Sequence, residues 1–129
     1  AATGASAVLV PARADLTTDV DAIAAAITPR TRCIFLNSPA NPSGTALTEA
    51  DYRALSALAE RHDLWLVVDE VYSHFRFDGA DVRAWQHGPA GRTVSVNSLS
   101  KSHAMTGYRV GWAIAPEALV AALGDWSAA

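Results

Sequence analysis

The sequence lacks several features that would assign it to a specialised class of protein. Its single cysteine, Cys33, excludes a framework of disulfide bonds. Only 18% of the residues are charged, the net charge is -3, and no basic run occurs, which argues against a nucleic-acid-binding surface. The sequence has no signal-peptide pattern and no apolar run long enough to span a bilayer. We therefore expect neither nucleic-acid nor membrane partners, and we predict a reducing, cytoplasmic location.

The chain has enough apolar material for one globular domain. Half of its 129 residues are hydrophobic, and a chain of this length buries roughly two-thirds of its unfolded surface. Cys33 lies inside the apolar run 33–36, so we expect it to be a small core residue. Because the sequence starts at Ala1 without a methionine, we expect it to be part of a longer protein.

Patterns typical of strands and helices alternate along the chain. Apolar or β-branched runs predict strands at residues 7–10, 31–36, 64–68, 92–97 and 110–115. Helical stripes and capping residues predict one helix after Thr18, one from Thr48 to His62, and one from Pro116. Residues 73–91 are predicted to be looser, with three glycines and a proline.

This alternation predicts an α/β fold with a mostly parallel sheet and flanking helices in three layers, α/β/α. The run 31–36 is apolar almost throughout, as is typical of a strand covered on both faces. The link between residues 97 and 110 is too short for a crossover helix with its turns, so the last strand is predicted to pair antiparallel.

Polar side chains follow three successive predicted strands. They are Asn41, then Asp69 with Tyr72, then Ser98 with Lys101. Ligands of open α/β sheets bind outside the carboxyl ends of the strands. We therefore expect these five side chains to face one crevice.

Lys101 is the most unusual of these residues. It lies between two apolar runs, where burial of an amine without a partner is costly, and this position favours a chemical role. Taken singly, each candidate also has an ordinary structural explanation. Lys101 could be an exposed loop lysine, Asp69 a helix cap, Tyr72 a ring at the edge of the core, Asn41 a turn residue, and Arg109 the partner of a surface carboxylate.

Three segments, in order along the chain, resemble the signatures of class I and II aminotransferases, the fold-type-I enzymes that use pyridoxal 5′-phosphate. They are Asn37–Gly44 (NSPANPSG), Asp69–Tyr72 (DEVY) and Ser98–Gly111, which holds SLSK and GYRVG. The resemblance covers nearly the whole chain. It implies that residues 1–129 are the central part of the cofactor-binding large domain, without its N-terminal cofactor loop and its C-terminal small domain.

The resemblance also implies roles for individual residues. Lys101 would hold the cofactor as an internal aldimine and later move a proton between the substrate α-carbon and the cofactor C4′. This requires a neutral amine, which burial and a nearby cation favour. Asp69 would keep the pyridine nitrogen protonated, and Tyr72 with Asn41 would hydrogen-bond the phenolic oxygen.

The same resemblance implies phosphate contacts from Ser98 and Arg109, with Gly107 and Gly111 allowing close backbone approach. No metal site is expected, because His62, His74, His87 and His103 lack metal-ligand spacing.

The function implied is transfer of an amino group from an α-amino acid to a 2-oxo acid by an enzyme that is a homodimer in its full-length form, whereas the isolated 129 residues are expected to be inactive. Two alternatives remain open. One is another reaction on the same cofactor, such as β-elimination by a C–S lyase. The other is an aminotransferase-like, cofactor-sensing domain of a transcription regulator.

Overall fold

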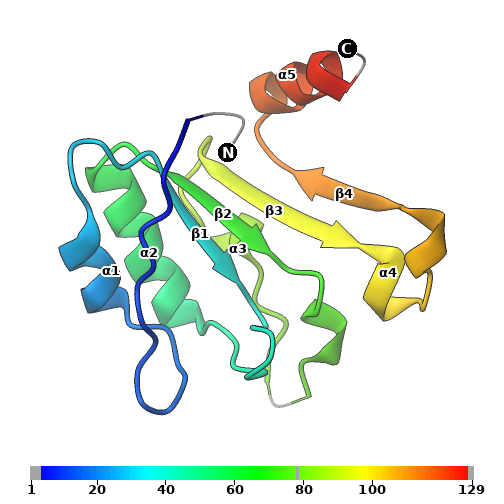
Figure 1. Cartoon of the computed structure of the whole chain (residues 1–129), viewed down its shortest axis with the longest axis horizontal. Coiled ribbons are helices and arrows are strands. Elements are labelled where there is room, and N and C mark those ends of the chain that lie inside the picture. The colour runs from blue at the N-terminus through cyan, green and yellow to red at the C-terminus, as the bar shows by residue number, and fades with distance from the viewer. Residues whose placement is uncertain (1–3, 78, 128–129) are drawn as a thin grey trace.

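The computed structural model describes residues 4–77 and 79–127 and contains a four-stranded mixed sheet (Figure 1). Its strands are β1 (Cys33–Asn37), β2 (Trp65–Asp69), β3 (Thr93–Ser98) and β4 (Gly111–Ile114). They lie in the order β1-β2-β3-β4, with β1, β2 and β3 parallel and β4 antiparallel to β3. The predicted α/β class, the mostly parallel sheet and the antiparallel last strand are confirmed.

The strand register brings the carboxyl ends of β1, β2 and β3 to one edge of the sheet. Asn37 at the end of β1 lies beside Asp69 at the end of β2, and Asp69 lies beside Val96 of β3. The next-but-one residue along β3, Ser98, pairs with Gly111 of β4. The three arrowheads in Figure 1 therefore point to a common edge, from which the loops carrying the polar residues emerge.

Three helices belong to the core. They are α1 (Val20–Ala26), α2 (Glu49–Arg61) and α3 (Ala84–His87). The predicted capping residue of α2 is confirmed, because the Thr48 side chain accepts a hydrogen bond from the N–H of Asp51. For α1 the cap is Asp19 rather than the predicted Thr18. Asp19 immediately precedes the first helical residue, and its carboxylate accepts from the N–H of Ala22 at 3.0 Å.

The remaining described elements are short turns of helix and one terminal helix. They are the 3-10 turns η1 (Ser73–Phe75) and η2 (Thr106–Tyr108), and the helices α4 (Leu99–Ser102) and α5 (Glu117–Ser127). Pro116 immediately precedes α5, as predicted. The sequence did not predict α4, which lies within the expected loop around Lys101. No helix in the described part of the chain is long and apolar enough to cross a bilayer.

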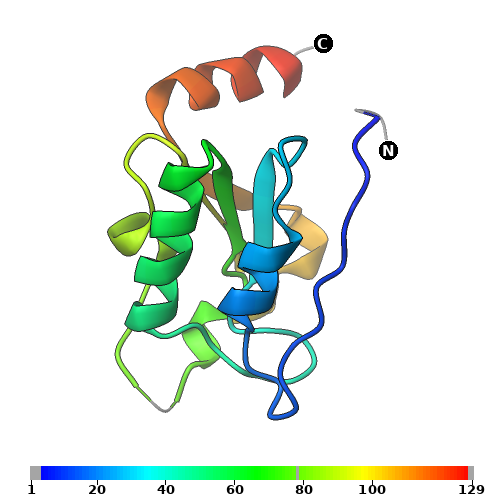
Figure 2. The same cartoon turned by 90° about the vertical axis from the view of Figure 1, so that its left-hand side faces the viewer.

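The core lies on one face of the sheet only. Ile34, Leu66 and Val68 point from β1 and β2 toward the helices, where they pack with buried residues of α1, α2 and α3. Tyr52 and Leu55 of α2 have no solvent exposure. Figure 2 shows α1 and α2 lying side by side against the sheet.

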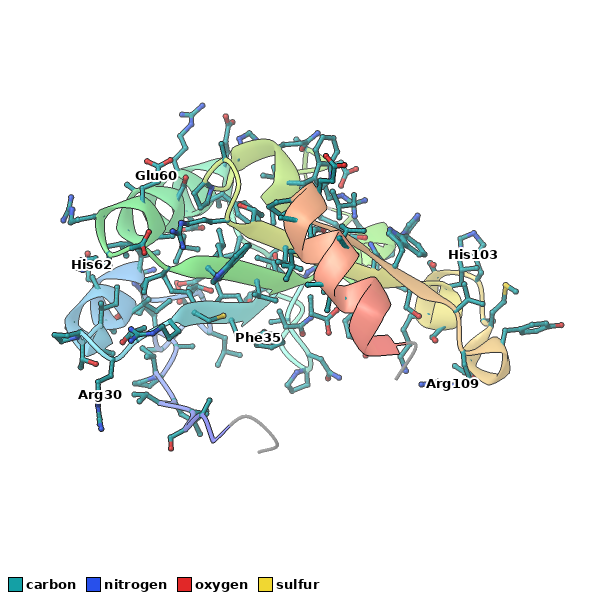
Figure 3. All side chains as sticks on the ribbon, turned by 90° about the horizontal axis from the view of Figure 1, so that it is seen from above. Arg30, Phe35, Glu60, His62, His103 and Arg109 are labelled. Carbon is teal, nitrogen blue, oxygen red and sulfur yellow. The ribbon has the colours of Figure 1, made fainter. Side chains whose placement is uncertain are left out.

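The opposite face of the sheet is open among the described residues. Because side chains alternate along a strand, Cys33 and Phe35 point away from the helices, and the Phe35 side chain is 67% exposed. Figure 3 shows Phe35 on the side of the sheet opposite to Glu60 of α2. The predictions that Cys33 is a core residue and that β1 is covered on both faces are therefore wrong. The described residues supply two layers, the sheet and one helical layer.

The predicted strand at residues 7–10 is also wrong. The structure has no regular element there, and Val8 and Leu9 are 74% and 91% exposed. A strand requires a neighbour that satisfies its backbone N–H and C=O groups, and no described strand pairs with this segment. An apolar run without such a partner is insufficient to form a strand.

Candidate functional site

All five side chains predicted to converge lie on segments that leave the same edge of the sheet. Asn41 is in the loop after β1, and Asp69 and Ser98 are the last residues of β2 and β3. Tyr72 immediately precedes η1, and Lys101 lies in α4 (Figure 1). The topology therefore gathers these segments at one edge, as predicted from strand order.

The loop of residues 37–44, which we call the asparagine loop, brings two of the candidates into contact. The Asn41 side-chain amide donates a hydrogen bond to the Tyr72 hydroxyl at 3.3 Å. The backbone N–H of Asn41 donates to Oδ1 of Asn37 at 2.9 Å, and the Nδ2 of Asn37 donates to the carbonyl of Asp69 at 2.9 Å. Asn37 thus connects the backbones of two candidate residues, a role that its position at the end of β1 could have suggested.

Further hydrogen bonds close the asparagine loop. The N–H of Gly44 donates to the carbonyl of Ala40 at 2.8 Å, and Gly44 adopts a φ of 74°, a left-handed conformation that favours glycine. The buried Ser38 hydroxyl accepts from the N–H of Leu47 at 3.0 Å. The asparagine loop, which contains two prolines, is therefore held by specific contacts.

A cavity of about 230 Å³ adjoins the Asn41–Tyr72 pair. The asparagine loop forms one wall, and Tyr72 and Phe75 form the other, with their rings tilted and 6.4 Å apart. A larger cavity, of about 350 Å³, is lined by residues 85, 88–91, 93 and 114–116 and contains none of the candidate residues. We assign the candidate site to the smaller cavity because two candidate residues, Asn41 and Tyr72, line it.

Asp69 is half-buried and held in a turn. Its Oδ1 accepts from the N–H of Val71 at 3.0 Å, and its carbonyl accepts from the N–H of Ser38 at 3.0 Å as well as from Asn37. Oδ1 of Asp69 therefore has an ordinary structural role in this turn. Since this bond orients the carboxylate at the end of β2, it is compatible with a binding role for the rest of the group.

Residues 98–111, which we call the lysine segment, form the other part of the site. The Ser98 hydroxyl accepts from the N–H of Ser100 at 2.9 Å, which caps α4, and donates to the carbonyl of Val110 at 3.0 Å. Arg109 is exposed, adopts a left-handed φ of 54°, and donates from Nη1 to the carbonyl of Thr106 at 3.2 Å. A non-glycine residue in this conformation is uncommon.

Lys101 is exposed, so the expectation of a buried amine is wrong for the described residues. It is also the only lysine among the 129 residues. No hydrogen bond or ion pair joins its side chain to another described residue, or links Arg109 to the asparagine loop. The short helix α4 follows β3 at the end of the sheet (Figure 1), and none of its residues is buried.

The two glycines of the lysine segment differ in how much space the described residues leave for a side chain. A Cβ on Gly111 would lie 2.9 Å from the carbonyl oxygen of Asn97, so the close pairing of β3 and β4 requires glycine there. A Cβ on Gly107 would meet no atom within 4 Å. The close backbone approach predicted for Gly111 is therefore explained by its neighbour strand.

Two histidines join the two parts of the site. The rings of His74 in η1 and His103 at the end of α4 meet edge to face, with centroids 6.0 Å apart. Nδ1 of His103 also lies 2.8 Å from the Ser102 hydroxyl. The described residues contain no group of three or more histidine, cysteine or acidic side chains that could hold a metal ion.

The sequence reading assigned no role to Glu70, which follows Asp69. Its side chain is almost completely buried, with 2% exposure, and lies on the helical side of the sheet. An acidic residue immediately after a buried strand is a visible signal, but its burial depends on which helices cover it.

Comparison with curated proteins finds relatives that are named transaminases or aminotransferases. The chain is 53% identical over 125 residues to the arginine–pyruvate transaminase of Pseudomonas aeruginosa, which covers 95% of this chain and 32% of that protein. It is 48% identical over 103 residues to an aspartate aminotransferase of Rhizobium meliloti, covering 77% of this chain and 25% of that protein. The chain thus spans about a third or less of the length of these relatives.

Solved structures agree with the sequence comparison. The aspartate aminotransferase of Thermus thermophilus with maleate superposes with a TM-score of 0.82 and 36% identity, over 88% of this chain and 29% of that one. The N-succinyldiaminopimelate aminotransferase of Mycobacterium tuberculosis gives a TM-score of 0.75 and 39% identity, over 80% and 27%. The sequence pattern of the family Aminotransferase class I and II matches residues 1–129. The chain therefore belongs to the class I and II aminotransferase family.

Proposed function

We propose that the whole protein containing this chain is a pyridoxal-phosphate-dependent aminotransferase that moves an amino group from an α-amino acid to a 2-oxo acid. The observation that carries the proposal is the hydrogen-bonded pair of Asn41 and Tyr72 at the sheet edge from which Lys101 also emerges, in a chain that matches the family throughout. Aminotransferase relatives at 48% and 53% identity support it.

The side chains at this edge suit the functional groups of the cofactor. When bound, pyridoxal 5′-phosphate supplies an aldehyde and a ring that accepts electrons. Lys101 carries an amine with no described partner, Asp69 has a carboxylate, and Asn41 and Tyr72 present an amide beside a phenol. The donor set therefore fits an amine-reactive, aromatic and anionic ligand.

Lys101 would hold the cofactor through Nζ and, once free, would move a proton from the α-carbon of the amino acid. An amine acts as a base only in its neutral form, and desolvation favours that form. Because Lys101 is exposed among the described residues, the groups that cover it would come from other parts of the whole protein or from a second subunit.

Asp69 and the Asn41–Tyr72 pair would orient the ring from two sides. The Asp69 carboxylate would hold a proton on the ring nitrogen by electrostatic attraction, while its turn bond to Val71 fixes its direction. Tyr72 and Asn41 would donate hydrogen bonds to the phenolic oxygen, and their mutual contact of 3.3 Å keeps the two donors adjacent.

Ser98 and Arg109 would bind the phosphate. The Ser98 hydroxyl is already positioned by Ser100 of α4 and by Val110, the residue before β4. The Arg109 guanidinium offers a planar fork suited to two phosphate oxygens. Arg109 uses Nη1 for the carbonyl of Thr106, which leaves its remaining N–H groups available for an anion.

The proposal extends to the setting of the chain. Residues 1–129 form the central part of a cofactor-binding large domain, and the whole protein acts as a cytoplasmic homodimer. The names of two relatives suggest the first substrates to assay, namely arginine with pyruvate and aspartate with a 2-oxo acid.

Borohydride reduction of the cofactor-loaded whole protein tests the proposal. We expect the pyridoxyl mass on the peptide that contains Lys101, the only lysine of this chain, as measured by mass spectrometry after digestion. The control is Lys101→Arg, which keeps the positive charge but cannot condense with an aldehyde, and should carry no label and no transamination activity. Label on a lysine elsewhere in the whole protein would show that the assignment is wrong.

A further inference from the structure

Glu70 is the buried ionisable residue between two candidate site residues. Asp69 precedes it and Tyr72 follows two positions later. The backbone N–H of Glu70 donates to the carbonyl of Val96 at 2.8 Å, which extends the pairing of β2 with β3 by one residue. Its carbonyl accepts from the N–H of Ser73 at 2.9 Å. The backbone of Glu70 is thus fixed on both sides of the turn that carries Asp69 and Tyr72.

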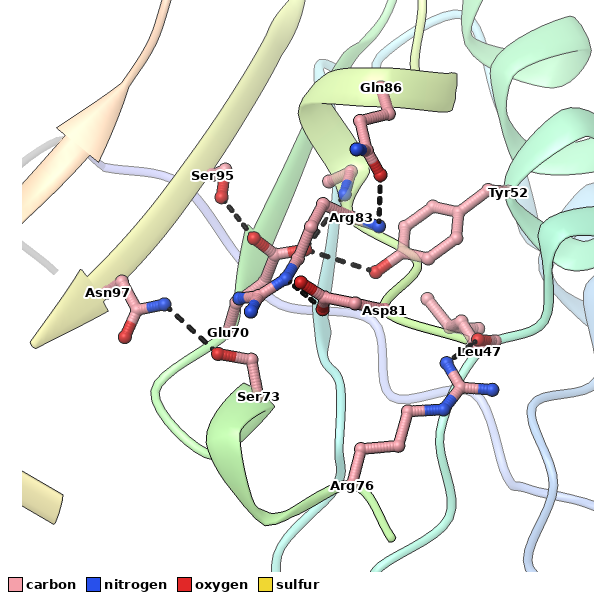
Figure 4. A network of polar contacts seen from close by, with 11 residues as sticks. Leu47, Tyr52, Glu70, Ser73, Arg76, Asp81, Arg83, Gln86, Ser95 and Asn97 are labelled. Atoms are coloured by element: carbon pink, nitrogen blue, oxygen red, sulfur yellow. Dashed lines mark hydrogen bonds and ion pairs between the residues drawn. The ribbon is translucent and has the colours of Figure 1, made fainter. Parts of the chain in front are cut away.

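The Glu70 carboxylate accepts hydrogen bonds from three separate elements (Figure 4). Its Oε1 accepts from the N–H of Ala84, the first residue of α3, at 2.8 Å and from the Tyr52 hydroxyl of α2 at 3.4 Å. Its Oε2 accepts from the Ser95 hydroxyl of β3. One side chain therefore ties the end of β2 to the strand beside it and to two helices beneath it.

The surroundings of Tyr52 keep its phenol protonated, so that the hydroxyl can donate to Glu70. Burial, followed by the nearby carboxylate of Glu70, raises the pKa of the Tyr52 phenol above its ordinary value. Tyr52 therefore remains protonated and able to donate at neutral pH. A buried carboxylate that lost its donors would be strongly disfavoured, so the network specifies one position for Glu70.

A second tie holds the other end of the same turn. The buried Asn97 side chain donates from Nδ2 to the Ser73 hydroxyl at 3.2 Å, so that β3 also anchors the residue after Tyr72. Tyr72 thus lies between two residues attached to β3, Glu70 and Ser73, and Asp69 immediately precedes the first of them. Glu70 is attached in addition to both helices. These attachments restrict the positions that the side chains of Asp69 and Tyr72 can adopt.

We propose that Glu70 is a positioning residue for the reaction: its buried carboxylate, bound by Tyr52, Ala84 and Ser95, holds the turn that presents Asp69 and Tyr72 to the cofactor. This inference rests on the proposed function for its catalytic meaning. The anchoring of the turn itself follows from the described contacts alone, and the two parts can be tested separately.

Two substitutions at Glu70 separate its size from its hydrogen bonds. Glu70→Leu introduces an apolar side chain of similar size and removes all three hydrogen bonds that the carboxylate accepts. Glu70→Gln keeps an oxygen that can accept from the N–H of Ala84 and from the Tyr52 hydroxyl, and the Ser95 hydroxyl can reorient to accept from the new amide. Leu58→Ala is the control, because it weakens the same core from α2 without touching the network.

The first measurement uses the cofactor-free whole protein. The amide protons of residues 71 and 73 are hydrogen-bonded within the turn, and that of residue 70 is bonded to Val96 of β3. We expect Glu70→Leu to speed the exchange of all three with solvent by about tenfold or more relative to Leu58→Ala. Glu70→Gln should exchange nearly as slowly as wild type. Equal exchange in Glu70→Leu and Leu58→Ala would overturn the anchoring role.

The second measurement uses the cofactor-loaded protein. We expect Glu70→Leu to shift the pH at which the absorbance of the lysine-bound cofactor changes, and to lower kcat by about tenfold with a smaller change in KM. Glu70→Gln should restore both values. Leu58→Ala should lower the melting temperature without moving the absorbance midpoint, because a loss of core stability alone leaves Asp69 and Tyr72 in place.

The proposal can still be tested if Glu70→Leu does not fold or if the proposed function fails. If Glu70→Leu fails to fold, Ser95→Ala and Tyr52→Phe each remove one donor, and both should shift the absorbance midpoint in the same direction by a smaller amount. No shift in either would contradict the positioning role. If wild-type protein takes no label on Lys101, the proposed function fails, whereas the exchange measurement still tests whether Glu70 anchors the turn.

Discussion

The asparagine loop and the lysine segment are two parts of one candidate site that are built in opposite ways. Asn37, Asn41 and the turn from Asp69 to Tyr72 are joined by hydrogen bonds and rest on a buried network. The lysine segment has mostly exposed side chains, and its side-chain hydrogen bonds run largely within itself.

The difference indicates which groups this chain positions by itself. Side chains that would orient the ring are held by the core of the described residues, whereas Lys101 and Arg109 would need contacts from elsewhere to be covered. A site is held more precisely where hydrogen bonds and packing from neighbouring residues lock its side-chain rotamers. The asparagine loop is therefore the preorganised part of the site.

The largest effect is expected from removal of the Asp69 carboxylate, which lies in the turn beside the asparagine loop. For Asp69→Ala we expect the single-turnover rate of amino-group transfer to fall by about 10²-fold or more, because the charge that keeps the ring nitrogen protonated is lost. Cofactor retention should weaken much less, since Asn41, Tyr72 and Ser98 remain. Rapid-mixing absorbance and cofactor titration measure the two quantities.

Asp69→Asn is the matched control for this change. Its amide oxygen can still accept from the N–H of Val71, so the turn is kept while the negative charge is removed. A rate as low as that of Asp69→Ala would assign the effect to charge. An unchanged rate in Asp69→Ala would remove the proposed electrostatic role altogether.

The two glycines sharpen the comparison within the lysine segment. Gly111→Ala should lower the free energy of unfolding by about 1–3 kcal/mol, because the new Cβ would lie 2.9 Å from the carbonyl oxygen of Asn97 and force β4 away from β3. Gly107→Ala should change it by no more than about 0.5 kcal/mol, since nothing lies within 4 Å. Urea unfolding of both variants measures the difference, and equal losses would contradict the structural explanation.

The smallest expected effect concerns pH and the core beneath the asparagine loop. Because the pKa of Tyr52 is raised above the ordinary value of about 10, folding favours the protonated phenol. This contribution is fully present below about pH 10 and is lost as pH rises toward the folded pKa, at up to about 1.4 kcal/mol per pH unit. Tyr52→Phe lacks the titrating group and should lose stability less steeply above about pH 10.

Urea midpoints of wild type and Tyr52→Phe between about pH 8 and pH 11 provide the measurement, and the difference between the two proteins removes contributions from other groups. Parallel slopes above pH 10 would show that the phenol is not held in its protonated state by burial beside Glu70.

Much of the fold was predictable because it depends on local patterns. β2 and β3 lie within a residue of their predicted bounds, since buried parallel strands are apolar runs closed by turn residues. The capping residue Thr48 was predictable because a helix cap also depends on a local sequence pattern. The segment 7–10 shows the limit, because its apolar run was correct as a pattern but a strand also requires a partner.

The sequence predicted the order in which the candidate residues leave the sheet edge, but it did not predict the contacts between them. Asn41, Tyr72 and Asp69 could be assigned to one edge from strand order alone. The connection through Asn37 and the three bonds of the Glu70 carboxylate required the tertiary structure, because their partners are distant in sequence. The short helix α4 was missed because four residues carry no apolar stripe.

The sequence by itself determined the class of fold, the antiparallel last strand and the order in which polar residues leave the sheet. Those properties follow from periodicity and loop length, which neighbouring residues specify. Only the tertiary structure decided that Glu70 is buried, that Phe35 and Cys33 face away from the helices, and that Lys101 is exposed among the described residues. Burial is decided by which elements pack against which, and this depends on residues far apart along the chain.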